Sequence, residues 1–316
     1  MKEQTRYISS KDGIQLFVRI WSPDETPKAV VQVVHGMAEH SQRYGRLAEA
    51  LCSEGIEVWA DDHRGHGQTA LGGKNPPEAG GLLGHCADQD GFNKVVADLE
   101  HLSGIIKQER PNVPLFLLGH SWGSFLAQAY IERSAQNLAG CILSGTRGPG
   151  GPEELVGAVL AALIAAIKGC RKFSPLIYKL ADGPYNNAFK PNRTQFDWLS
   201  RDNAEVDAYV ADPLCGFPCS VAFYRDLARG LRSIHRKEAL DRIPKNLPIF
   251  VFAGSADPVG EMGKSPTKLV EAYKQEGIKD LEFILYPEGR HEMLNEINRE
   301  EVIQNLLSWL NRHLHT

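Results

Sequence analysis

The residues best suited to covalent chemistry lie in the stretch Gly119-His120-Ser121-Trp122-Gly123. A short apolar run at residues 115–118 precedes it, and a helix-like run at residues 125–130 follows it. The pattern G-x-S-x-G between a strand and a helix is typical of a nucleophile elbow, a sharp turn that holds a serine in a strained backbone conformation. The two glycines leave room for the strand and the helix to approach each other closely. We therefore predict that Ser121 is a nucleophile.

A serine hydroxyl becomes a strong nucleophile only when a base removes its proton. In folds that carry this elbow, an acid and then a histidine follow the serine along the chain. Asp257 follows the apolar run 249–253, and His291 follows the run 281–286. Because both residues come directly after predicted strands, we expect Ser121, Asp257 and His291 to meet at one sheet edge. They would act there as nucleophile, orienting acid and general base.

Other residues compete for these roles. His120 adjoins the serine, but its side chain should point away from Ser121. His63 and His66 precede the serine, which is the wrong order for the base. The competing carboxylates are Asp202, Asp212, Glu288 and Glu292. The first two lie in a segment of helical character and the last two flank the histidine, so Asp257 is the better candidate acid.

A tetrahedral intermediate needs hydrogen-bond donors for its negatively charged oxygen. One donor should be the backbone N–H of Trp122, the residue after the nucleophile. The second should come from His35-Gly36-Met37, which follows the run 29–34, and we select the N–H of Met37. Backbone donors do not depend on the type of side chain. We expect the side chains of Met37 and Trp122 to shape the pocket walls.

Strand-like and helix-like runs alternate from residue 29 onward, after a predicted N-terminal hairpin. The β-branched run 29–34 is typical of a strand that is covered on both faces. The other predicted strands are 56–60, 115–118, 138–144, 249–253 and 281–286, and the main predicted helices are 44–53, 90–107, 265–275 and 300–314. This order predicts an α/β fold, a mostly parallel sheet with helices on both faces. Ligands bind beyond the carboxyl ends of the strands in such sheets.

The alternation stops at the glycine- and proline-rich stretch 146–152. We expect residues 146–240 to form an inserted, mainly helical cap, and residues 1–145 and 241–316 to form the core. The apolar run 155–167 has two interpretations. It is either a buried helix or a cap helix that lines an acyl pocket or rests on lipid, with Lys168, Arg171 and Lys172 at the headgroup level. It is too short to span a bilayer.

Composition and charge argue against several classes of protein. The chain is 42% hydrophobic and 23% charged, as in a globular enzyme, and its net charge of −4 gives no basic excess for nucleic acid. The polar N-terminus and the lack of long apolar stretches predict a cytoplasmic protein. The six cysteines are expected to be free thiols in a reducing compartment.

We expect neither a cofactor nor a metal. No glycine-rich dinucleotide fingerprint follows the first parallel strand. The early histidines lack a matched set of cysteine or carboxylate ligands: His35, His40, His63 and His66. The pair Cys215 and Cys219 has neither the spacing of a redox motif nor a second pair to complete a zinc site.

The chain resembles monoacylglycerol lipases and the lysophospholipase-type α/β-hydrolases of the serine aminopeptidase superfamily. The resemblance rests on HGMAEHS at 35–41, DHRGHGQ at 62–68, GHSWG at 119–123, GSAD at 254–257, His291 and the segment 201–215. It implies an α/β-hydrolase fold with a helical cap and hydrolysis of acyl esters without a cofactor. By position, the family's nucleophile, acid and base correspond to Ser121, Asp257 and His291, and its oxyanion donors to Met37 and Trp122. Trp122 stands where these lipases carry a smaller methionine.

The expected function is therefore that of a serine hydrolase that cleaves carboxylic esters of single-chain lipids through an acyl-enzyme, as monoacylglycerol lipases do. A lysophospholipase and a general small-ester carboxylesterase stay open as alternatives. A peptidase, an acyltransferase and a non-catalytic ligand receptor on the same fold are less favoured. The expected partner is a small acyl ester or lipid, with transient contact between the cap and a membrane or micelle.

Overall fold

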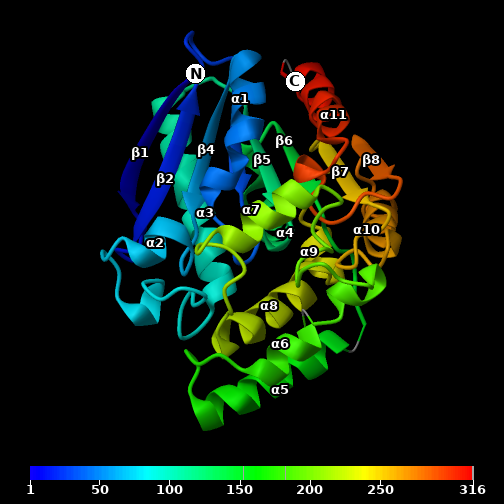
Figure 1. Ribbon diagram of the computed structural model, residues 1–316. Helices are drawn as coiled ribbons and strands as arrows, with labels where there is room; N and C mark the ends of the chain where they lie inside the picture. Colours follow the sequence, from blue (N-terminus) through cyan, green and yellow to red (C-terminus); the bar gives the residue numbers. More distant parts are fainter. Residues whose placement is uncertain (152, 182, 315–316) are drawn as a thin grey trace.

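The computed structural model describes residues 1–151, 153–181 and 183–314. One sheet of eight strands runs through the molecule in the order β1-β2-β4-β3-β5-β6-β7-β8 (Figure 1). The strands are β1 (Lys2–Ser9), β2 (Gln15–Ser22), β3 (Ala29–Val34), β4 (Ile56–Asp62), β5 (Leu115–His120), β6 (Gly140–Ser144), β7 (Ile249–Gly254) and β8 (Leu281–Tyr286). β1 and β2 pair antiparallel, β2 pairs antiparallel with β4, and the remaining neighbours are parallel. The predicted α/β fold is confirmed.

Helices cover both faces of this sheet. α1 (Gly45–Ser53) and α11 (Arg299–Arg312) pack on one face, and α3 (Gly91–Glu109), α4 (Trp122–Ser134) and α10 (Lys264–Gln275) pack on the other. The strands from β3 to β7 are buried along their whole length, so their side chains contribute to both cores. Burial on both faces explains why these strands are continuous apolar runs instead of alternating ones.

The strand and helix limits differ from the predicted ones in a few places. β4 continues to Asp62, two residues beyond the predicted end, because Asp61 and Asp62 still pair with β2, and the buried Asp62 carboxylate accepts hydrogen bonds from Ser41 and Gln68. A buried carboxylate is tolerated when hydrogen bonds satisfy it. The stretch 70–87, which holds many glycine and proline residues, contains the end of α2 (Gly67–Leu71) and the short helix η2 (Pro77–Ala79). The remaining short helices outside the β6–β7 connection are η1 (Ser41–Tyr44), η3 (Ala135–Asn137) and η5 (Met293–Asn295).

The chain between β6 and β7 is helical. Its elements are α5 (Glu153–Lys168), α6 (Pro175–Ala181), η4 (Tyr185–Phe189), α7 (Asn203–Ala211), α8 (Val221–Ile234) and α9 (Lys237–Leu240). α8 packs on α3 and α4 of the sheet's helical layer, and α5 packs on α8. In Figure 1, α5 and α6 lie at the lower end of the molecule, away from both chain termini.

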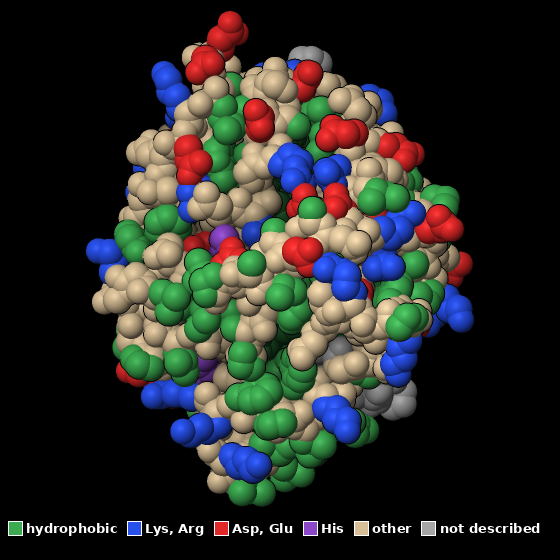
Figure 2. Space-filling model, in the orientation of Figure 1, with side chains coloured by type: hydrophobic (Ala, Val, Ile, Leu, Met, Phe, Trp, Pro, Cys, Tyr) green, Lys and Arg blue, Asp and Glu red, His purple; other side chains and the backbone are tan. Residues whose placement is uncertain are grey.

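The apolar helix α5 is only partly buried. Ala161 is buried, whereas Val156, Val159, Leu163 and Ile167 are 51–82% exposed. The interpretation of this run as a buried helix is therefore wrong. Figure 2 shows hydrophobic side chains gathered at this lower end, with Lys and Arg side chains beside them. None of the helices in the described part of the chain is long and apolar enough to cross a bilayer.

Candidate functional site

Ser121 occupies a sharp turn between β5 and α4. Its backbone has φ 54° and ψ −123°, in the region of positive φ that non-glycine residues rarely adopt. A Cβ atom on Gly119 would lie 2.4 Å from the carbonyl oxygen of Gly123, and one on Gly123 would lie 2.0 Å from that of Val34. Both glycines are therefore required by close backbone contacts. Backbone strain held in place by tight packing is a common property of functional sites.

Asp257 and His291 follow β7 and β8 and contact each other directly. Both carboxylate oxygens of Asp257 lie 3.0 Å from Nδ1 of His291. Asp257 is 0% exposed and His291 is 2% exposed. Burial lowers the pKa of His291, but the charge and hydrogen bond of Asp257 outweigh that effect and raise it above its usual value. Asp257 can thus hold the ring in one orientation and stabilise its protonated form.

Ser121 and His291 line the same cavity, which has a volume of about 450 Å³. Among the described residues, no hydrogen bond joins the Ser121 hydroxyl to the His291 ring. Such bonds are often long or misaligned until a substrate is bound. The fold therefore brings the three predicted triad members to one sheet edge, with Asp257 and His291 already in hydrogen-bond contact.

The two predicted oxyanion donors lie on either side of the elbow. Met37 follows β3 and lines the site cavity, and Trp122 is the first residue of α4. No hydrogen bond between described residues uses either backbone N–H. The side chain of Trp122 does not line the site cavity as we expected. It packs against His66 and Phe223 instead, with ring centroids 5.2 and 4.8 Å away.

A largely buried arginine that was not predicted from the sequence connects two loops. The first follows β3 and carries Met37, the predicted oxyanion donor, and is called the oxyanion loop below; the second follows β8 and carries His291. Arg43 donates to Glu39 at 2.7 Å and forms two hydrogen bonds of 2.7 Å with Glu292, the neighbour of His291. Glu39 in turn accepts from the backbone N–H of Gly36 at 2.5 Å. Burial opposes the charge of Glu292, but Arg43 lowers its pKa well below the usual range. The geometry of both loops thus depends on one ion cluster, whose signal in the sequence is the Glu39-x-x-x-Arg43 spacing.

The rival histidines lie close to the site but make other contacts. His120 lies beside His291 with ring centroids 4.9 Å apart, and burial together with the His291 charge lowers its pKa to about 4. The rings of His35 and His63 stack at 3.8 Å, and Asp61 bonds to Nδ1 of His63 at 2.7 Å. These rings are buried beneath the elbow, which agrees with a structural role.

The rival carboxylates also have other partners. Asp202 caps α7 by accepting from the N–H of Ala204, and Asp212 bonds to His40. Glu288 lies on the surface and Glu292 is paired with Arg43. Of the candidate acids, Asp257 is the one that contacts His291 in the described structure.

A second cavity of about 390 Å³ lies between the helical segment that connects β6 and β7 and the helical layer of the sheet. Tyr224 lines both cavities. The second cavity is mainly apolar, and its lining includes Phe125, Leu160, Ile177, Leu180, Tyr185, Leu231 and Val259. The site cavity is bordered by polar side chains from η4 and the segment after it, namely Asn186, Asn187, Asn192, Thr194 and Gln195. The site cavity, with its polar border, thus adjoins the apolar second cavity.

Comparison with known proteins gives consistent results. Residues 25–298 match the family model described as serine aminopeptidase, S33. A monoacylglycerol lipase of Mycolicibacterium smegmatis is 30% identical over 302 residues, which cover 96% of this chain and 95% of that protein. The human monoglyceride lipase is 31% identical over 304 residues, covering 92% and 88% of the two chains.

A solved structure shows the same architecture. The carboxyl esterase of Bacillus coagulans, determined in complex with glycerol, has a TM-score of 0.90 and is 28% identical, with 99% of each chain covered. The family match spans most of the sequence, and the order of elements agrees with the hydrolase sheet described above. The chain therefore belongs to the serine aminopeptidase S33 family and has the α/β-hydrolase fold.

Proposed function

We propose that this chain hydrolyses carboxylic esters of single-chain lipids, and monoacylglycerols in particular, through an acyl-enzyme formed on Ser121. The observation that carries the proposal is the strained Ser121 in one cavity with the buried His291–Asp257 pair. The relatives named as monoacylglycerol lipases and the carboxyl esterase of the same fold support this class of reaction.

In the proposed reaction, His291 removes the proton of Ser121 as its oxygen attacks the ester carbonyl. Asp257 stabilises the imidazolium that forms, and the N–H groups of Met37 and Trp122 bind the oxyanion. His291 then gives its proton to the leaving alcohol. Water, activated by the same histidine, releases the fatty acid and regenerates the serine.

The two cavities suggest how such a substrate would lie. We propose that the apolar cavity beyond Tyr224 receives the acyl chain and that the polar residues of η4 and the segment after it face the glycerol group. One apolar chamber beside one polar chamber suits a lipid with a single chain. A lysophospholipid has the same form with a larger head group, so lysophospholipase activity stays the second candidate.

We also propose that residues 146–240 act as a cap and that the exposed apolar face of α5 contacts a lipid surface from which substrate enters. Lys168, Arg171 and Lys172 follow this face and would meet anionic headgroups. A cytoplasmic location is part of this proposal, because the cysteines at positions 52, 86, 141, 170 and 215 are free thiols, as is usual in a reducing compartment.

The test combines active-site labelling with a substrate panel. A fluorophosphonate probe should label the wild type, and Ser121→Ala should abolish labelling and lower kcat by a factor of about 10⁴ or more. Ser233→Ala is the matched control, because Ser233 lies on α8 and bonds to the carbonyl of Gly230. Labelling that persists in folded Ser121→Ala would refute the assignment of the nucleophile.

The same panel identifies the substrate. We expect monoacylglycerols to be cleaved with a higher kcat/KM than lysophospholipids of the same chain length and than p-nitrophenyl acetate. A preference for lysophospholipids would favour the second candidate. A preference for the acetate would contradict an acyl chamber and favour a general esterase.

A further inference from the structure

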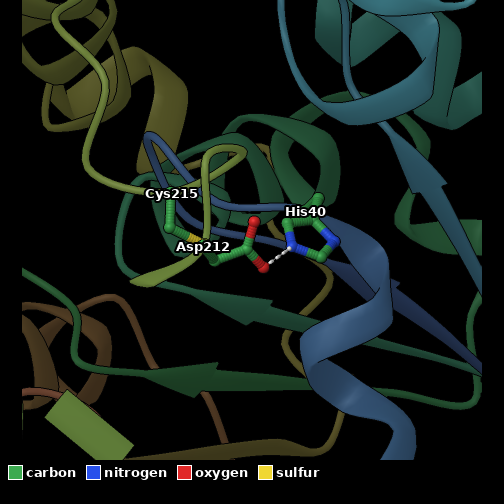
Figure 3. A group of neighbouring side chains, drawn as sticks. All are labelled: His40, Asp212 and Cys215. Carbon is green, nitrogen blue, oxygen red and sulfur yellow. Dashed lines mark hydrogen bonds and ion pairs between the residues drawn. The ribbon is translucent and has the colours of Figure 1, made fainter. Parts of the chain in front are cut away.

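A histidine, a carboxylate and a cysteine converge beside the oxyanion loop (Figure 3). His40 lies in the loop after β3, Asp212 ends α7, and Cys215 lies in the following turn. One ligand atom from each residue can be chosen so that all lie within 4.8 Å of one another. Nε2 of His40 is 2.9 Å from Oδ2 of Asp212. His40 has no matched ligands near it in the sequence, because these partners lie 172 and 175 residues further along the chain.

We propose that His40, Asp212 and Cys215 bind a divalent transition-metal ion, with Zn²⁺ as the best fit, which links the oxyanion loop of the core to the turn after α7. This proposal does not depend on the substrate of Ser121, because the ion would act outside the catalytic triad.

The donor set fits zinc. Imidazole nitrogen, carboxylate oxygen and thiolate sulfur are the three ligand types that Zn²⁺ uses in proteins. Tetrahedral bonds of about 2.0 Å to nitrogen and oxygen and about 2.3 Å to sulfur place ligand atoms roughly 3.3–3.6 Å apart. The three ligand atoms now lie within 4.8 Å of one another, so side-chain movements of about 1 Å would bring them to these separations. The magnesium and calcium ions prefer sites made of oxygen ligands alone, so they fit less well.

The protein holds these ligands in place before any ion binds. Oδ1 of Asp212 accepts from the N–H of Leu214 at 2.8 Å, which leaves Oδ2 directed at His40. The carbonyl oxygen of Asp212 accepts from the N–H of Cys215 at 3.0 Å. His40 and Cys215 are 7% and 8% exposed, whereas the Asp212 side chain is 32% exposed. Solvent can therefore reach the cluster past Asp212 and supply water as a fourth ligand.

The position of the cluster gives the ion a structural effect on the catalytic cavity. The N–H of Gly216 donates to the carbonyl oxygen of Ala38 at 2.9 Å, and the Tyr209 hydroxyl donates to the same oxygen at 3.0 Å. Ala38, Tyr209 and Gly216 all line the cavity of Ser121. An ion bound next to these contacts would reinforce the attachment of the helical segment to the oxyanion loop. Zn²⁺ binds cysteine as the thiolate, so the ion would displace the thiol proton of Cys215 on binding.

Cobalt titration of the full chain tests the site directly. Co²⁺ bound to a thiolate gives a charge-transfer band in the near ultraviolet. We expect this band to saturate at one equivalent in the wild type and to disappear when Zn²⁺ is added. Cys215→Ser should abolish the band, whereas the matched control Cys219→Ser should keep it. An absent band in the wild type, or its loss in Cys219→Ser, would overturn the proposed ligand set.

Thermal unfolding gives a second measurement that does not rely on the thiol. An ion that binds only the folded state raises the Tm. We expect Zn²⁺ to raise the Tm of the wild type and of Cys219→Ser by several degrees and to leave that of Asp212→Asn unchanged. Circular dichroism confirms that each variant is folded. Because Asp212 is partly exposed, Asp212→Asn keeps the test decisive even if Cys215→Ser does not fold. An equal rise in Asp212→Asn would contradict the proposal.

Discussion

The sheet edge around Ser121 buries charged side chains, whereas the outer face of α5 exposes apolar ones. At the sheet edge, charged groups are fully or largely buried and are paired, as with Asp257 and His291 or Arg43 and Glu292. On α5, apolar side chains such as Leu163 and Ile167 face solvent at 57% and 82% exposure. A buried, paired charge fixes geometry, whereas an exposed apolar face is available for another apolar surface. The arrangement at the sheet edge suits a catalytic site, and the arrangement on α5 suits binding to an apolar surface.

The largest expected effect concerns the ion cluster at the sheet edge. Arg43→Met should lower the free energy of unfolding by about 3–5 kcal/mol, because Glu39 and Glu292 would remain buried without their counter-ion. Arg46→Met is the matched control. Arg46 pairs with Glu205 on the surface with 43% of its side chain exposed, so the loss should be below about 1 kcal/mol. Urea unfolding measures the free energy of unfolding of both variants. Equal losses in the two variants would contradict the difference expected between the buried cluster and the surface ion pair.

The pH dependence of kcat/KM tests the same buried edge with an intermediate effect. His291 must be neutral to accept the serine proton, and its pKa is raised above the usual value of about 6.5. Activity should therefore be present above the raised pKa and fall about tenfold per pH unit below it. A limb centred near pH 4 would instead report His120, whose pKa is lowered to about 4, and would contradict the role of His291.

The smallest effect on stability is expected on α5. Leu163→Gln and Ile167→Gln should change the free energy of unfolding by less than about 0.5 kcal/mol, because both side chains already face solvent. Binding to anionic phospholipid vesicles, measured by sedimentation, should nevertheless fall. Leu71→Gln on α2, where Leu71 is 55% exposed, is the matched control and should keep vesicle binding. Equal vesicle binding by all three variants would show that α5 is not the contact surface.

Much of the fold was predictable from local patterns. The buried strands from β3 to β7 are visible in the sequence as apolar runs. The elbow around Ser121 is recognisable because close backbone contacts exclude any residue but glycine at two of its positions. The places of Asp257 and His291 followed from a rule of parallel sheets, since loops after successive strands meet at one edge. Their catalytic roles stay predictions, which the labelling and pH experiments address.

The sequence by itself determined those elements and that edge, because hydrophobic periodicity and turn chemistry act over a few residues. Only the tertiary structure decided which distant side chains meet. Arg43 and Glu292 are 249 residues apart, and Asp212 and Cys215 reach His40 from a different segment. The exposed face of α5 was equally undetermined, because a helix that is apolar on all sides gives no sign of which face its neighbours cover. Packing between distant segments decides which side chains meet and which helix face is covered. The local spacing of residues does not determine that packing.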